Sequence, residues 1–148
     1  MGKNSIIKAL RINYLAALVA ALVVLLAFEC GWLAEGVLLD TVSPTTVYVS
    51  QVAVVMCTVV LIPLAIKGFT RALVKAKGMS EDAFLVVFCK KSLQRMFLLF
   101  VVLVLNEFAY YGLAYDGALY CGLLGLGAMI YSYPTKNVLE QYLGEAEK

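Results

Sequence analysis

The sequence predicts an all-α protein with a single membrane domain over residues 1–148, in which four transmembrane helices form a bundle and both termini are cytoplasmic. The first observation behind this prediction is composition: 63% of the 148 residues are hydrophobic and the mean hydropathy is +0.90, well outside the range of soluble domains. The second is a set of four long apolar runs. The third is the separation of basic from acidic residues, which orients these runs.

A helix needs roughly 20 apolar residues to cross the hydrocarbon core, and the first three apolar runs have such lengths, whereas the fourth, at 118–133, is short for a crossing. The basic start of the chain also fits a secretory signal peptide. However, the first run is long for a signal peptide, and Ala27–Cys30 lacks a small-residue cleavage site. We therefore expect four spans, at about 12–34, 46–66, 92–111 and 118–133.

A cluster of basic residues between the second and third spans sets the predicted topology. Such a cluster is costly to move across a bilayer, so we place it in the cytoplasm, in contact with anionic lipid headgroups. A docking surface for a cytoplasmic partner is the alternative interpretation. The cluster holds seven of the twelve Lys and Arg residues: Lys67, Arg71, Lys75, Lys77, Lys90, Lys91 and Arg95.

The segment 67–91 predicts a cytoplasmic helical hairpin. Gly78 is a good helix-ending residue, and Ser80 is a good N-cap for the returning helix. The tail, residues 135–148, predicts a short amphipathic helix because Leu139 and its apolar neighbours share one helical face. In the docking interpretation this tail packs on the same hairpin.

Polar residues near the outer ends of the spans form a candidate pocket for an ion or a proton. Glu107 follows Arg95 by twelve residues, about 18 Å along a helix, which puts the carboxylate inside the membrane in its outer half. Intramembrane acids are functional-site candidates because a charge there needs a partner or water. Asn106, Glu29 and Gln51 have similar predicted depths and can converge with Glu107 on one pocket. The alternative is that they face different ways and the acids reach the outer headgroups.

Small residues mark a helix-packing face on the fourth span: Ala118, Gly122 and Gly125. At spacings of three and four, such residues let helix backbones approach closely in lipid. We expect this face to pack within the bundle, with a homodimer or partner-subunit interface as the alternative.

The histidine and cysteine content limits the kinds of metal, cofactor and disulfide site that we expect. The chain has no histidine and its four cysteines form no C-x-x-C pair, so we expect no zinc site and no cofactor. Cys30 and Cys121 fall near the outer ends of their helices, where a disulfide can form on the oxidising side of a bacterial inner membrane. Nothing indicates nucleic-acid binding, because the basic residues lie against the spans.

This layout, together with the ending Tyr131–Glu140, resembles a class of small uncharacterised four-span inner-membrane proteins of gut-type bacteria. The resemblance implies a location in the bacterial inner membrane and implies no particular function. Small multidrug exporters are similar only in span count, because they use an acid deep in the first span whereas Glu29 is close to its exit.

Two functional hypotheses follow. The favoured one is a non-enzymatic membrane protein that acts by helix-mediated association, as a homo-oligomer or an accessory subunit. The alternative is a small transporter, or a cation- or proton-binding protein, that uses Glu107 and Glu29. An enzyme is not expected, since histidine is absent and no acid–base or nucleophile pair falls on one helix.

Overall fold

The computed structural model describes residues 2–146, and this part of the chain is helical throughout, with short connections and no strand. This confirms the all-α prediction. Residues 147–148 of the predicted tail lie outside the described residues. The helices are α1 (Lys3–Glu29), α2 (Val37–Thr41), α3 (Pro44–Lys75), α4 (Glu81–Gly112), α5 (Asp116–Tyr131) and α6 (Lys136–Ala146).

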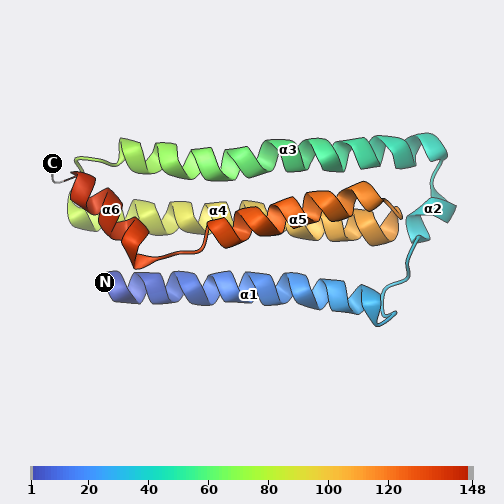
Figure 1. Cartoon of the computed structure of the whole chain (residues 1–148), viewed down its shortest axis with the longest axis horizontal. Coiled ribbons are helices and arrows are strands. Elements are labelled where there is room, and N and C mark those ends of the chain that lie inside the picture. The colour runs from blue at the N-terminus through green and yellow to red at the C-terminus, as the bar shows by residue number, and fades with distance from the viewer. Residues whose placement is uncertain (1, 147–148) are drawn as a thin grey trace.

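The long helices α1, α3, α4 and α5 lie side by side along the longest axis of the molecule (Figure 1). α4 is central, because α1, α3 and α5 all pack on it, and α5 also packs on α3. We call the end that holds the turn 76–80, α6 and the start of α1 the hairpin end. The opposite end, which holds α2 and residues 113–115, is the loop end (Figure 1).

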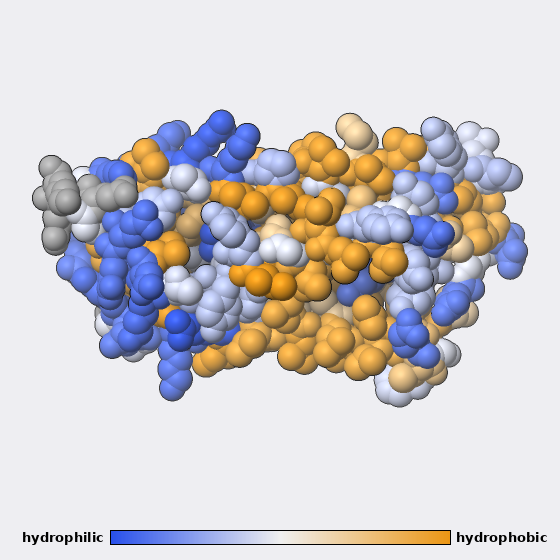
Figure 2. All heavy atoms as spheres, in the orientation of Figure 1, coloured by the Kyte–Doolittle hydropathy of each residue, from blue (hydrophilic) through white to orange (hydrophobic). Residues whose placement is uncertain are grey.

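Within residues 2–146, two helices are long and apolar enough to cross a membrane, α1 and α3. α5 is also apolar but shorter, with 16 residues. Figure 2 shows hydrophobic side chains over the middle of the molecule and hydrophilic ones toward its two ends, most densely at the hairpin end. These observations support membrane association.

The end of α1 differs from the predicted first span, 12–34, because the helix stops at Glu29. Gly31 takes up a left-handed conformation with φ of +72°, which costs glycine no steric strain. The backbone N–H of Trp32 then donates to the carbonyl of Ala27 at 2.9 Å. This bond pattern is a Schellman motif, which satisfies the last carbonyls of a helix and ends it.

The helices α3 and α4 form the predicted hairpin. Ser43 caps the start of α3, since its side chain accepts a hydrogen bond from the Thr46 backbone N–H at 3.3 Å. α3 then continues to Lys75, and Gly78 makes the turn with φ of +91°. Ser80 takes the N-cap position of α4, although its side chain makes no capping hydrogen bond.

Apolar side chains from α1, α3, α4 and α6 meet in one core at the hairpin end. Phe84 and Phe88 are each 1% exposed, and Leu73 is fully buried. Leu139 of α6 belongs to the same core and Tyr142 packs against it, so the amphipathic tail does pack on the hairpin. Burial of each such side chain stabilises the fold by about 1.5–3 kcal/mol.

The predicted packing face of α5 lies against α4. Ala118 is fully buried. A Cβ atom added at Gly125 would lie 2.9 Å from Cγ1 of Val102, closer than real Cβ contacts allow, and one at Gly122 would lie 3.6 Å from Cβ of Asn106. This face therefore packs against α4 within the chain, as expected.

Candidate functional site

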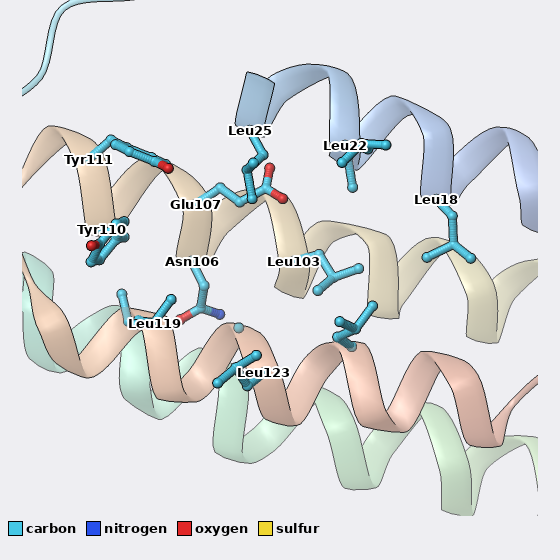
Figure 3. A pocket seen from close by; sticks show the side chains of 14 residues that line it. Leu18, Leu22, Leu25, Leu103, Asn106, Glu107, Tyr110, Tyr111, Leu119 and Leu123 are labelled. Atoms are coloured by element: carbon cyan, nitrogen blue, oxygen red, sulfur yellow. The ribbon is translucent and has the colours of Figure 1, made fainter. Parts of the chain in front are cut away.

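A cavity of about 370 Å³ lies between α1, α4 and α5. It forms because α1 and α5 both pack on α4 and leave a gap between themselves. Leu22 and Leu123 are 53% and 57% exposed, so the cavity opens sideways onto an apolar surface. Six leucines of the two flanking helices line it: Leu18, Leu22, Leu25, Leu119, Leu123 and Leu126. The first five are labelled in Figure 3.

Two adjacent polar side chains of α4, Glu107 and Asn106, reach this cavity. Figure 3 shows the Glu107 carboxylate pointing toward α1, beside Leu25, and the Asn106 amide pointing toward α5. Oε2 of Glu107 and Oδ1 of Asn106 are buried and have no hydrogen-bond partner among the described residues. An unpaired buried acceptor costs about 1–3 kcal/mol, which a ligand with a donor group would offset.

Asn106 is held in one orientation by α3. Its Nδ2 donates to Oγ1 of Thr58 and to the carbonyl of Val102, both at 2.8 Å. The Thr58 hydroxyl donates in turn to the carbonyl of Val54 at 3.0 Å. Because both donors of the amide group face these acceptors, the amide oxygen is the atom left for another partner.

At the loop-end side of the cavity, the last turn of α1 is attached to α4 through Tyr111. The Tyr111 hydroxyl donates to the Glu29 carboxylate. The Phe28 ring stacks on the Tyr111 ring with centroids 4.6 Å apart, and Phe108 meets Phe28 edge to face at 5.4 Å. Glu29 therefore holds a wall of the cavity in place while its own side chain stays exposed.

The predicted convergence of four polar residues is thus only partly realised. Glu107 and Asn106 share the cavity, and Glu29 touches one of its lining residues, Tyr111. Gln51 is half-buried on α3, which contributes no lining residue, so the prediction that it joins the pocket is wrong. The reason is that α3 and α1 lie on opposite sides of α4 and α5 (Figure 1).

At the hairpin-end side, carbonyls at the end of α5 and in the connection that follows it accept hydrogen bonds from α1 and α4. The Tyr14 hydroxyl donates to the carbonyl of Met129 at 2.8 Å, which ties α1 to α5 and closes the gap between them. Arg95 donates to the carbonyl of Ser132 at 2.8 Å. Arg11 donates to the carbonyl of Pro134 at 3.1 Å. These bonds hold the end of α5 and the start of the connection that follows it against α1 and α4.

Arg95 departs from the role predicted for the basic cluster. Its guanidinium lies 3.8 Å above the centre of the Phe69 ring and bonds to the end of α5, so it is engaged with other parts of the protein. Lys91 is half-exposed and donates to Oε1 of Gln94 at 2.9 Å. Five other members of the cluster are exposed: Lys67, Arg71, Lys75, Lys77 and Lys90.

The proposed disulfide between Cys30 and Cys121 is absent, since both thiols are free. Cys30 follows the last turn of α1 and is exposed, and α1 and α5 are separated by the cavity at this end of the molecule. No group of three or more His, Cys, Asp or Glu residues within 2–146 is arranged to hold a metal ion.

Three partners at this site were not foreseen from the sequence: Tyr111 for Glu29, Thr58 for Asn106, and Tyr14 at the end of α5. Each is a polar side chain inside an apolar run, which is the signal that could have drawn attention to them.

Comparisons with family models, with curated proteins and with solved structures find no match to this chain.

Proposed function

We propose that this protein is a four-span integral membrane protein that binds a small lipophilic cation in the cavity between α1, α4 and α5. Glu107 would supply the negative charge and Asn106 a hydrogen-bond acceptor. The observation that carries the proposal is a carboxylate with a buried, unpaired oxygen in a cavity otherwise walled mainly by leucines. A charge in such surroundings is costly unless it is paired, so a protonated amine is its natural complement.

The arrangement of charges supports the proposed topology. The basic cluster and Arg11 lie at the hairpin end, whereas Glu29, Asp40 and Asp116 lie at the loop end. Under the positive-inside rule the hairpin end, with both termini, is cytoplasmic. α1, α3, α4 and α5 are then the four spans, in a bacterial inner membrane as the sequence resemblance implies.

The shape of the cavity supports the ligand class. Its volume of about 370 Å³ lies within the range of small-molecule sites, roughly 300–1,000 Å³. Since it opens sideways between Leu22 and Leu123, an apolar ligand can enter from the bilayer without passing through water. We therefore expect an aromatic or alkyl body that carries one ammonium group.

Binding of 4-phenylbutylamine to the detergent-solubilised full chain tests this proposal, with 4-phenyl-1-butanol as the neutral control. We expect the amine to bind more tightly than the alcohol and Glu107→Gln to weaken amine binding by roughly tenfold or more, because charge-assisted hydrogen bonds are worth about 1.5–3 kcal/mol. Native mass spectrometry at graded ligand concentrations measures both.

The matched control is Asp40→Asn, which removes the same charge near the same end of the molecule. Because Asp40 is exposed on α2 and does not line the cavity, its replacement should change amine binding less than threefold. Equal weakening by the two variants, or equal binding of amine and alcohol, would contradict the role of Glu107.

Association remains the second candidate. The small-residue face of α5 packs on α4, and two of its residues, Ala118 and Gly122, also line the opening between α1 and α5, an apolar groove that a helix of a second copy can enter. The mass of the gently extracted protein tests this: a stable multiple of 16.1 kDa favours association, and a monomer favours the small-molecule proposal.

A further inference from the structure

A second hollow lies on the opposite side of the central helix, between α3 and α4 at the hairpin end. It has a volume of about 370 Å³, and bases from both helices line it, namely Arg71 and Lys75 of α3 and Lys91 of α4. No Asp or Glu is among the described residues that line it. Gly68, which has nothing within 4 Å of a Cβ built on it, helps to leave the hollow open.

A smaller hollow of about 120 Å³ continues the first one toward the middle of the molecule, and Gly68 and Lys91 line both. Its walls include Leu64 and Leu98, and Arg95 adds a fourth positive charge. We call the two hollows together the α3–α4 groove. The groove is therefore basic near the hairpin end. Toward the hydrophobic middle of the protein its walls combine the apolar side chains of Leu64, Phe69 and Leu98 with Gln94 and Arg95.

We propose that the α3–α4 groove is a binding site for one anionic phospholipid of the leaflet at the hairpin end. The phosphate group lies among Arg71, Lys75 and Lys91, and one acyl chain follows the apolar part of the groove past Leu64 and Leu98. This order of charges and apolar groups matches a phospholipid with its headgroup at the membrane surface. The site is distinct from the cavity of Glu107 and does not depend on what binds there.

Native mass spectrometry of the full chain with added dioleoyl phosphatidylglycerol, and with dioleoyl phosphatidylcholine as the zwitterionic control, tests this site. We expect retention of one phosphatidylglycerol and at least tenfold weaker retention of phosphatidylcholine. The variant Arg71→Gln/Lys91→Gln should weaken phosphatidylglycerol binding about tenfold or more. Lys67→Gln/Lys90→Gln removes the same charge from exposed residues outside the groove. This variant should weaken phosphatidylglycerol binding less than twofold.

A second variant tests shape without changing charge. Gly68→Leu places an isobutyl group in the groove, and the free space around Gly68 lets the helix tolerate it. We expect at least a fivefold loss of bound phosphatidylglycerol. Gly127→Leu, at another helical glycine with free space, should leave lipid binding unchanged. Circular dichroism of each variant checks that the helices are intact.

Two results would overturn the proposal as a specific lipid site. Equal losses in the two charge variants, or normal binding by Gly68→Leu, would mean that the bases attract the membrane surface only diffusely. A third result would overturn the assignment to a lipid: if glycerol 3-phosphate at millimolar concentration binds as tightly as phosphatidylglycerol and displaces it, the groove takes a soluble phosphate ester and the acyl chain contributes nothing.

Discussion

At the hairpin end, Phe84, Phe88 and Leu73 are almost completely buried, whereas farther along the bundle Leu22 and Leu123 are about half exposed around a cavity. The difference follows from the proposed surroundings. In water, burial of apolar surface drives the helices together and fills the core. In a bilayer, lipid tails are as apolar as leucine, so nothing forces α1 onto α5 and small residues and polar bonds decide the packing.

The largest expected effect tests this contrast directly. Phe88→Ala should lower the free energy of unfolding by about 3–5 kcal/mol, because it leaves a void in a tightly packed core. Leu22→Ala should lower it by less than about 1 kcal/mol, since half of that side chain already faces the surroundings. Denaturant titration in mild detergent, followed by circular dichroism, measures both. Similar losses would mean that the two regions are packed alike.

A smaller loss of stability is expected from Arg95→Met, which keeps the apolar part of the side chain and removes the guanidinium. The variant loses a charged hydrogen bond to the Ser132 carbonyl and the contact with the Phe69 ring, for a destabilisation of about 2 kcal/mol. Lys90→Met removes an exposed charge and should change stability by no more than about 0.5 kcal/mol. If both variants melt at the wild-type temperature, the bond to Ser132 contributes nothing.

Two glycines of α5 test how tightly this helix is packed in the middle of the molecule. Gly125→Ala should destabilise by about 1–3 kcal/mol, because the added methyl group would lie 2.9 Å from Val102. Gly127→Ala meets no atom within 4 Å and should be neutral or stabilising by up to about 1 kcal/mol, from helix propensity alone. Thermal unfolding of the pair in the same detergent gives the difference. Equal effects would show that α5 can move away from α4 without cost.

The smallest expected effect concerns the hydrogen bond between Thr58 and Asn106. A double-mutant cycle with Thr58→Val and Asn106→Leu should give a coupling energy of about 0.6 kcal/mol, the average for such bonds inside membranes. A coupling above about 2 kcal/mol would contradict this expectation and show that the bond contributes more than is usual inside a bilayer. Unfolding free energies of the four proteins provide the measurement.

Sequence patterns predicted the helices and the hairpin because these are local properties. The glycine at 78 and the apolar spacing around Leu139 act within a few residues, and both predictions agree with the structure. The end of α1 was placed too late because its hydrophobicity continues past Glu29, while Gly31 has the conformation that ends the helix. The end of the first helix predicted from hydrophobicity alone was therefore wrong, because the turn at Gly31 ends the helix.

The site was less predictable because depth along a helix does not fix the face on which a residue lies. Glu107, Glu29 and Gln51 were assigned similar depths, yet they belong to three helices whose rotation only the packing determines. Asn106 was placed in the pocket through its adjacency to Glu107, and its partner Thr58 lies 48 residues away in the chain. Such pairings depend on tertiary contacts that no local pattern encodes.

The length of α5 has a consequence for the membrane itself. Its 16 residues rise about 24 Å, whereas the 32 residues of α3 rise about 48 Å. A hydrocarbon core is about 30 Å thick, so in the four-span arrangement the α5 side of the protein shows a hydrophobic mismatch. In the proposed arrangement, lipids beside α5 would compress, at a fraction of a kcal/mol per Å, and we expect the protein to favour thin regions of bilayer, where that elastic cost disappears.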